Sequence, residues 1–174
     1  MNIEHDFTNL FATLNEYCEK FKELYVENLK NDDRVATGQL INNVKTLVKA
    51  GNDTFEVVLQ VADYYQWLEN GRKAGKFPPV DKILDWIRVK NILPTPDKNG
   101  KLPTEQQLAF LIGRAIKENG TIKDKGYDGG HYVKKTMDAL NTEYINRLHE
   151  ALQKDFDEYS IKIWNGINKN MIKT

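Results

Sequence analysis

The sequence predicts an α+β fold, in which an antiparallel β-hairpin or small sheet is packed by long N- and C-terminal helices and by short central helices. Apolar residues recur at helical spacing near both ends of the chain. Between residues 44 and 61 they alternate in a strand pattern, and all five prolines fall between residues 78 and 103. With 174 residues, of which 40% are hydrophobic, the chain is expected to form a single domain over residues 1–174.

The N-terminal helix is predicted over residues 1–30. Its apolar positions, at alternating steps of four and three, form a heptad seam of Ile3, Phe7, Leu10, Leu14, Tyr17, Phe21 and Leu24, widened by Phe11, Cys18 and Tyr25. This stripe could dock on a neighbouring subunit or inside the chain. We expect internal packing because residues 131–174 carry a second long helical repeat, which includes Val133, Met137, Leu140, Tyr144, Leu148, Leu152, Phe156, Tyr159 and Ile163.

A β-hairpin is predicted after the first helix. Phe55, Val57 and Leu59 alternate with Glu56 and other outward positions, as in a strand with one buried face. A similar alternation runs over residues 44–49, and residues 51–54 (GNDT) supply turn residues. An isolated hairpin is marginal in water, so helices or further strands, from this chain or another, are expected to cover it.

The proline-rich centre predicts short elements with sharp ends. A helix is expected to begin near Pro78 and Pro79 and to stop before Pro94, with Trp86 in the core. Truncating a core Trp86 to Ala would cost about 3–5 kcal/mol. A loop or small hairpin around residues 95–104 and a helix ending at Gly120 should follow. Residues 121–130, rich in glycine and charge, are the best candidate for a mobile loop.

The sequence lacks recognisable catalytic and metal-binding motifs. The three histidines are far apart, Cys18 is the lone cysteine, and Ser160 lacks a nucleophile motif. A carboxylate pair of Asp63 and Glu69 near Arg72 is better read as an ion pair or solvated helix face. We therefore expect no enzyme activity, cofactor or metal. The N-terminus shows no export signal and no apolar run is long enough to span a membrane, so no membrane association is expected.

Charge is balanced overall but not locally. The 25 basic residues equal the 25 acidic ones, which excludes a uniformly basic nucleic-acid binder. Residues 1–60 hold six basic and ten acidic side chains, whereas residues 61–125 hold twelve and eight. The two parts could make complementary contacts between neighbouring subunits or pair internally.

Residues 62–94 concentrate aromatic, glycine, proline and basic residues. Tyr65 and Trp67 should anchor the segment to the core, while Gly71 permits an unusual backbone conformation. Lys76 and Phe77 are expected at an exposed tip. The predicted subunit interface consists of Arg72, Lys73, Lys76, Phe77, Pro78 and Pro79.

In the order of these pieces the chain resembles the small neck and tail-completion proteins of tailed bacteriophages, a family of minor tail and head-tail connector components. The resemblance covers roughly residues 35–140: TGQLINNV, a hairpin, YYQWLENGRKAGKFPP, ILDWIRVKNI and LAFLIGRAIKENGT. The matching positions are Thr37, Gly38, Leu40, Tyr65, Glu69, Gly71, Lys76, Phe77, Pro78, Pro79, Ile83, Trp86, Lys90, Ile116 and Gly120. The α+β core at 35–130 is the family-like part, and residues 140–174 extend beyond where many members stop.

The resemblance implies a structural virion protein that is assembled in the host cytoplasm. Its subunits would form a homo-oligomeric ring that joins or closes capsid and tail, with portal, adaptor or tail proteins as neighbours and at most non-specific contact with genomic DNA in the lumen. A closed ring uses a heterologous interface, in which one patch of a subunit meets a different patch of the next. The alternative is a prophage- or host-encoded protein that binds nucleic acid or an acidic partner through the basic central loop.

Overall fold

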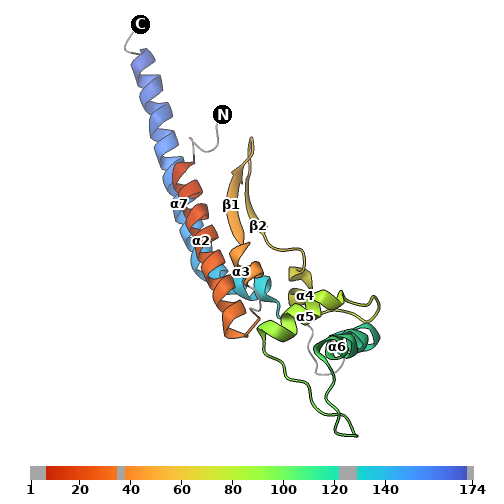
Figure 1. Cartoon of the computed structure of the whole chain (residues 1–174). Coiled ribbons are helices and arrows are strands. Elements are labelled where there is room, and N and C mark those ends of the chain that lie inside the picture. The colour runs from red at the N-terminus through yellow and green to blue at the C-terminus, as the bar shows by residue number, and fades with distance from the viewer. Residues whose placement is uncertain (1–6, 35–37, 122–128, 172–174) are drawn as a thin grey trace. The chain divides into compact units, whose positions relative to one another are not determined.

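The computed structural model describes residues 7–34, 38–121 and 129–171 (Figure 1). Contacts divide the chain into two compact units, each assembled from stretches far apart in sequence. The first comprises Met1–Glu27, Val44–Gln60 and Lys134–Thr174, and the second comprises Asn28–Asn43 and Val61–Val133. Helices flank a two-stranded antiparallel sheet, so the predicted α+β class is confirmed. The single domain stays a prediction.

The first unit is built on two long antiparallel helices, α2 (Thr8–Asn31) and α7 (Tyr132–Met171), which lie side by side in Figure 1. Aromatic rings pair along them, with centroids 5.7 Å apart for Phe7 and Phe156 and 5.2 Å for Tyr17 and Tyr144. The Arg147 guanidinium also binds Glu16, with one N–O distance of 2.7 Å. The N-terminal stripe therefore packs on the C-terminal helix of the same chain, as the sequence predicted.

The hairpin follows the predicted turn. β1 (Lys45–Ala50) pairs with β2 (Phe55–Gln60), with Ala50 opposite Phe55, and the Gly51 N–H donates to the Thr54 carbonyl at 2.8 Å. The rings of Phe11 and Phe55 lie 5.7 Å apart, so α2 covers part of the hairpin. Within the described residues no third strand joins the sheet.

The second unit contains four helices, α3 (Gln39–Asn42), α4 (Tyr65–Asn70), α5 (Val80–Val89) and α6 (Glu105–Asn119). Ile83, Ile87 and Ala109 form the centre of its core, where α5 packs on α6. Partly buried side chains around this centre are Val80, Leu84, Ile92, Leu108 and Ile112.

The ends of these helices follow the local sequence. Pro79 precedes α5, Thr104 and Gln107 form a capping box at the start of α6, and Gly120 ends α6 at a φ of 71°. Between α5 and α6 the Asp97 carboxylate accepts hydrogen bonds from the backbone of Asn99 and Lys101, at 2.8 and 2.9 Å. The predicted central helices and loop are confirmed.

Two differences from the sequence predictions concern this unit. Trp86 is 41% exposed, so its predicted place in the core is wrong. Ile83 and Ile87 fill the buried side of α5, and Trp86 lies about 100° around the helix from Ile87. The short helix α3 had no periodic signal, since it has four residues. Most of the loop predicted to be mobile, residues 122–128, lies outside the described residues.

Candidate interaction surface

The basic segment, defined here as residues 71–77, connects α4 to α5 and contains four of the six predicted interface residues. Lys73 and Lys76 are exposed, whereas Arg72 and Phe77 are partly buried. The backbone leaves α4 through Gly71, whose φ of 66° and ψ of 174° suit only glycine. Glycine at this position is therefore explained by local backbone geometry.

Backbone contacts hold the basic segment on the end of α6. The Arg72 N–H donates to the Thr121 hydroxyl at 2.8 Å, and the Thr121 N–H donates back to the Arg72 carbonyl at 2.7 Å. The Gly75 N–H donates to the Lys117 carbonyl at 2.8 Å, which satisfies a carbonyl in the last turn of α6. The segment is thus a clamped loop rather than a free one.

Close approach to Gly120 makes this clamp possible. A Cβ at Gly120 would lie 2.3 Å from the Arg72 carbonyl oxygen and 2.8 Å from the Ala74 nitrogen. Cβ atoms in proteins essentially never come this close to other atoms. The positive φ of Gly120 also favours glycine. Gly120 therefore serves both as the end of α6 and as the seat of the basic segment.

The Arg72 guanidinium interacts with groups of its own loop and of α4 rather than pointing into solvent. Its guanidinium donates to the Lys76 carbonyl at 2.8 Å and lies 5.1 Å from the centre of the Trp67 ring. The cation-π contact and the hydrogen bond fix the guanidinium on the loop itself. Lys73 and Lys76 are consequently the side chains that present positive charge outward.

Phe77 is not an exposed tip, so that prediction is wrong. Its ring approaches Gly113 on α6, where an added Cβ would lie 2.6 Å from the Phe77 ring, and it lies 5.4 Å from the ring of Phe110. Pro78, which follows, is buried, and Pro79 is exposed at the start of α5. Of the predicted interface residues, Lys73, Lys76 and Pro79 face solvent.

Glu69 has a structural role that sequence reasoning missed. Its side chain is 7% exposed, and both carboxylate oxygens lie 3.1 Å from the Val133 N–H at the start of α7. The carboxylate supplies the negative charge that a helix N-terminus favours. The neighbouring backbone pairs as well, because the Gly130 N–H donates to the Leu68 carbonyl at 2.7 Å. Glu69 therefore does not lie on a solvated helix face, which was one of the two expected readings.

The remaining motif positions divide between core and surface. Leu40 is buried next to Gly38, which begins α3 at a φ of 76°. Lys90 binds the Asp33 carboxylate, with 2.5 Å between the nitrogen and the oxygen. Tyr65 is 37% exposed and Trp67 47% exposed, so neither is anchored in the core as predicted.

The anchor in this region is instead the preceding tyrosine. The Leu40 backbone hydrogen-bonds the Tyr64 side chain and lowers its pKa, but burial has the larger effect and raises the pKa overall. Tyr64 is partly buried, in contrast to Tyr65. The double tyrosine of the motif thus has one side chain turned toward the core and one toward solvent.

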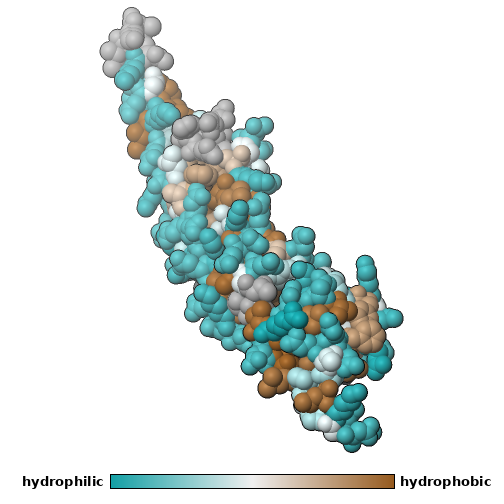
Figure 2. All heavy atoms as spheres, in the orientation of Figure 1, coloured by the Kyte–Doolittle hydropathy of each residue, from teal (hydrophilic) through white to brown (hydrophobic). Residues whose placement is uncertain are grey.

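Exposed apolar side chains contact the basic segment at two points. Trp67, 47% exposed, lies against Arg72, and Phe110, 52% exposed, lies against Phe77. Leu111 on α6 and Trp86 on α5 are also exposed. Figure 2 shows the apolar (brown) side chains that lie on the visible face among hydrophilic ones. Aromatic side chains such as these are enriched at protein interfaces.

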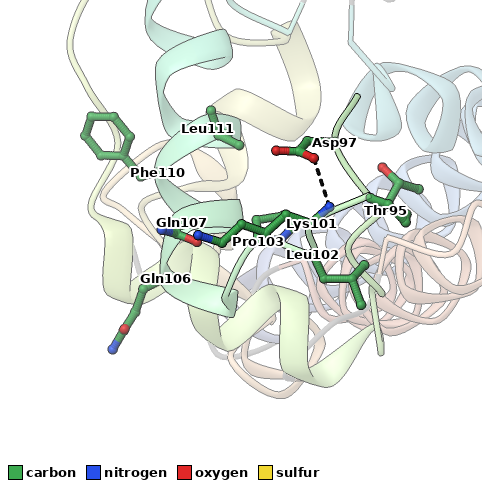
Figure 3. Close-up of a pocket in the computed structure, with 10 residues that line it drawn as sticks. Thr95, Asp97, Lys101, Leu102, Pro103, Gln106, Gln107, Phe110 and Leu111 are labelled. Atoms are coloured by element: carbon green, nitrogen blue, oxygen red, sulfur yellow. Dashed lines mark hydrogen bonds between the residues drawn. The ribbon is translucent and has the colours of Figure 1, made fainter. Parts of the chain in front are cut away.

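An open hollow of about 750 Å³ lies between the loop after α5 and the first turns of α6 (Figure 3). Its ionisable lining residues are Asp97 and Lys101, and the Asp97 carboxylate is bonded to the turn backbone. Apolar side chains such as Leu102, Phe110 and Leu111 make up much of the remaining wall. The hollow is thus a mainly apolar surface whose one carboxylate, that of Asp97, is already hydrogen-bonded.

Among the residues that the structure describes, no three His, Cys, Asp or Glu side chains gather in a way that could hold a metal ion. Within the same residues, no helix combines the length and apolar character needed to cross a membrane. Comparison of the chain with family models, curated proteins and solved structures finds no match.

Proposed function

We propose that this chain is a structural component of the neck or tail of a tailed bacteriophage, a subunit that assembles into a ring joining or closing capsid and tail. The observation that carries the proposal is the order of the sequence pieces between residues 37 and 121, which resembles that of neck and tail-completion proteins. In this proposal the protein acts through its surfaces and has no catalytic role.

The clamped geometry of the basic segment supports the proposal. A loop that contributes to a subunit interface binds better when its conformation is already fixed, because less conformational entropy is lost on assembly. The hydrogen bonds from Arg72 and Gly75 to the end of α6 fix the conformation of the basic segment, and they leave Lys73 and Lys76 exposed. A heterologous contact between these lysines and an acidic patch on the next subunit fits a ring.

Two measurements test the proposal. Electron microscopy and solution mass should reveal rings or a tendency to form them, and mass spectrometry should detect the chain in virions of a phage that encodes it. A protein that is strictly monomeric and absent from such virions would rule the proposal out. Free subunits can be monomeric before assembly, so the virion measurement has the greater weight.

A double charge-reversal variant tests whether the subunit interface includes the basic segment. The double variant Lys73→Glu, Lys76→Glu should fold normally, because both side chains are exposed, but should no longer assemble or enter virions. The matched control is Lys98→Glu, Lys101→Glu, which reverses two exposed lysines on the other loop of the same unit. Equal loss of assembly in both variants would point to net charge rather than to the basic segment.

A second candidate function is binding of nucleic acid or an acidic partner by the same segment. The exposed Lys73 and Lys76 beside the exposed Trp67 ring favour it, because cations and aromatic faces together suit single-stranded nucleic acid. It predicts a salt-sensitive mobility shift with DNA or RNA that the Lys73→Glu, Lys76→Glu variant lacks. No shift at low salt would count against nucleic-acid binding.

A further inference from the structure

The two strands of the hairpin each have an outer edge, and the turn shows which backbone groups point outward there. The Gly51 N–H donates to the Thr54 carbonyl, so both residues direct their backbone groups into the hairpin. The register continues without a bulge, and inward and outward residues alternate along antiparallel strands. On β2 the outward residues are Phe55, Val57 and Leu59. We call their outward N–H and C=O groups the β2 edge.

The β2 edge is open in the part of the chain that the structure describes. No hydrogen bond from another described segment reaches its groups, and no third strand joins the sheet there. The side chain at its centre, Val57, is 42% exposed, and Phe55 is partly buried where its ring meets Phe11 of α2. A row of backbone donors and acceptors beside an exposed valine is a ready template for a further strand.

The outer edge of β1 is less accessible. Its outward residues, Thr46, Val48 and Ala50, are all partly buried, and the side-chain oxygen of Thr46 is fully buried. In the view of Figure 1, β1 lies between β2 and the helices α2 and α7. The strand also carries the exposed Lys45 and Lys49, and lysines on an edge strand oppose pairing with another chain. The β2 edge is therefore the one that a further strand can reach.

We propose that the β2 edge binds the β2 edge of a second copy of this chain, with the two strands antiparallel, so that two hairpins form one four-stranded sheet. The ligand of such an edge is an extended strand, because a strand presents N–H and C=O groups at the matching spacing. Among the described residues the chain has two strands, and β2 is the one with an open edge. Two copies that join through their sheets therefore meet β2 to β2, which is an isologous contact.

The outward groups and the side chains of β2 select one register. With Val57 of one copy opposite Val57 of the other, Phe55 of each copy faces Leu59 of the other, and all groups of both edges are paired. Apolar side chains then lie opposite each other, and each Glu56 lies opposite Val58 of the other copy. A register that places the two Glu56 side chains opposite each other pairs fewer groups and opposes like charges. A parallel pair in register opposes the same two carboxylates.

The pairing extends a sheet that is marginal by itself. A two-stranded hairpin has little stability in water, whereas three or more strands with an apolar face are stable. In the register centred on Val57, the faces of the two hairpins that carry Phe55 lie on the same side of the joined sheet, so the α2 helix of each copy packs on that side. Each strand has six residues, and the contact is smaller than the roughly 1,200 Å² of a standard stable complex. The pair is expected to form at micromolar or higher concentrations.

This pairing goes beyond the proposed ring. A ring closes through a heterologous contact, whereas the β2 pair is isologous, so the two use different surfaces. The β2 edge belongs to the first unit and the basic segment to the second. The Lys73→Glu, Lys76→Glu variant should therefore still pair through β2, and loss of the β2 pair should leave ring assembly intact. Failure of one proposal is thus distinguishable from failure of the other.

Sedimentation over a concentration series tests the pairing. The wild-type chain should pass from the mass of one chain to that of two, and Val57→Pro should weaken the association at least tenfold. Because the Val57 N–H points outward, proline removes a donor of the β2 edge and no hydrogen bond of the hairpin itself. Val57→Lys should have the same effect, because it places two like charges opposite each other, and it serves if Val57→Pro fails to fold. Circular dichroism checks the fold of each variant.

Asn52→Lys is the matched control for this experiment. It adds the same charge to the same hairpin, but Asn52 is an exposed residue of the turn. Its association should equal that of the wild-type chain. A wild-type chain that stays monomeric to millimolar concentration, or an equal effect of Asn52→Lys and Val57→Lys, would overturn the proposal.

Hydrogen exchange locates the paired edge. In the free subunit the outward amides of Val57 and Leu59 should exchange quickly, whereas the amide of Val58, which points into the hairpin, should be protected. Where the dimer predominates, exchange at Val57 and Leu59 should slow at least tenfold, and exchange at Thr46 and Val48 on β1 should not change. Equal new protection on β1 would show that the hairpins join β2 to β1, which would overturn the proposal. Protection of β2 only after addition of another virion protein would overturn it as well, since the bound strand would then belong to that protein.

Disulfide cross-linking tests the register. Glu56 and Val58 of opposite copies form a non-hydrogen-bonded pair, with Cα atoms about 4.5 Å apart, which is within the range that a disulfide spans. A mixture of Glu56→Cys and Val58→Cys chains should therefore form the mixed disulfide. The native Cys18 is 2% exposed and should not react. Cross-linking of Glu56→Cys with itself but not with Val58→Cys would show a parallel pair or a shifted register, and either would overturn the proposal.

Discussion

Asp155 on α7 provides the N-terminal cap that α2 lacks in its own sequence. The first turn of α2 has no acidic residue, and the buried Asp155 carboxylate accepts hydrogen bonds from the backbone of Asn9 at 2.9 Å and of Leu10 at 2.8 Å. Two otherwise unpaired N–H groups are satisfied by one side chain that lies more than a hundred residues away in sequence. The carboxylate also carries the charge that suits a helix N-terminus.

Replacing Asp155 with Ala should lower the free energy of unfolding by about 2 kcal/mol, because it removes the cap and leaves donors unpaired. Asp155→Asn keeps one acceptor oxygen and should cost less. Urea unfolding followed by circular dichroism measures both. Asp157→Ala is the control, since Asp157 is exposed and accepts a hydrogen bond only from the Gln153 side chain among the bonds described. An equal loss of stability at Asp155 and Asp157 would show that the cap contributes little.

Tyr132 links the start of α7 to the end of α2 and should make stability sensitive to alkaline pH. Its side chain is 1% exposed, and its hydroxyl donates to the Asp32 carboxylate at 2.9 Å. Burial, and then the hydrogen bond to Asp32, raise the pKa of Tyr132 from 10.0 to about 12. The folded protein therefore holds the phenol proton at pH values where the unfolded chain has lost it.

Tyr132→Phe should remove this dependence. Because the pKa is raised on folding, the stabilisation is complete below pH 10 and is lost as the pH rises from 10 toward 12. In that window the wild-type advantage over Tyr132→Phe should fall by about 1.4 kcal/mol per pH unit. Urea unfolding of both proteins at several pH values measures it, and the other tyrosines cancel because both chains contain them. Parallel pH profiles for the two proteins would contradict the assignment.

For single residues, the sequence indicated which positions are important but not which contacts their side chains make. Trp86 was expected in the core because of its size, but a helix on the surface buries only one side, and the aliphatic Ile83 and Ile87 occupy it. Glu69 was expected to be solvated or ion-paired, and it caps a helix that begins more than sixty residues later. Both outcomes depend on contacts between distant residues, which spacing along the chain does not show.

The backbone contacts that clamp the basic segment on α6 connect two elements of the second unit. This clamp depends on Gly120, where any side chain would collide with the Arg72 carbonyl and the Ala74 nitrogen. Gly120→Ala should therefore release the segment while most of α6 stays folded. Because the segment contains Arg72, Lys73 and Lys76, release should increase its cleavage by trypsin severalfold under native conditions.

The control for this experiment is Gly100→Ala. Gly100 also has a positive φ, of 76°, but an added Cβ would meet nothing within 4 Å, so this variant reports backbone strain without a collision. Mass spectrometry of the first tryptic fragments should show faster cleavage after residues 72–76 in Gly120→Ala only. Similar fragment patterns in the two variants would mean that the segment is held by other contacts.

The elements themselves were largely predictable. Periodicity, turn residues and helix caps are local signals, and the long helices, the hairpin and the helices on either side of the 95–104 loop all follow them. The approach of the basic segment to α6 was not predictable. It depends on the absence of a side chain at Gly113, next to Phe77, and at Gly120, next to Arg72. From the sequence alone, Gly113 is only a glycine inside a helix and Gly120 only a helix end. Phe77 was assigned to an exposed tip for the same reason.

At the scale of the whole molecule, the two units interleave in sequence, which no local pattern indicates. The first is assembled from both ends of the chain and the hairpin, and the second from the segments between them. The basic segment lies wholly within the second unit. It can therefore be altered without changing any residue of the α2–α7 packing in the first.

Trp67 reports on the basic segment, because it is 47% exposed and its ring lies 5.1 Å from the Arg72 guanidinium. Its emission in the free subunit should resemble that of solvated indole, and burial in an interface should shift it to shorter wavelength. The chain has three tryptophans, so a variant with Trp86→Phe and Trp164→Phe reports only Trp67. The Trp67 emission should shift when rings assemble, and addition of Lys73→Glu and Lys76→Glu should abolish the shift. If rings form and the Trp67 emission does not change, the interface uses a surface other than the basic segment.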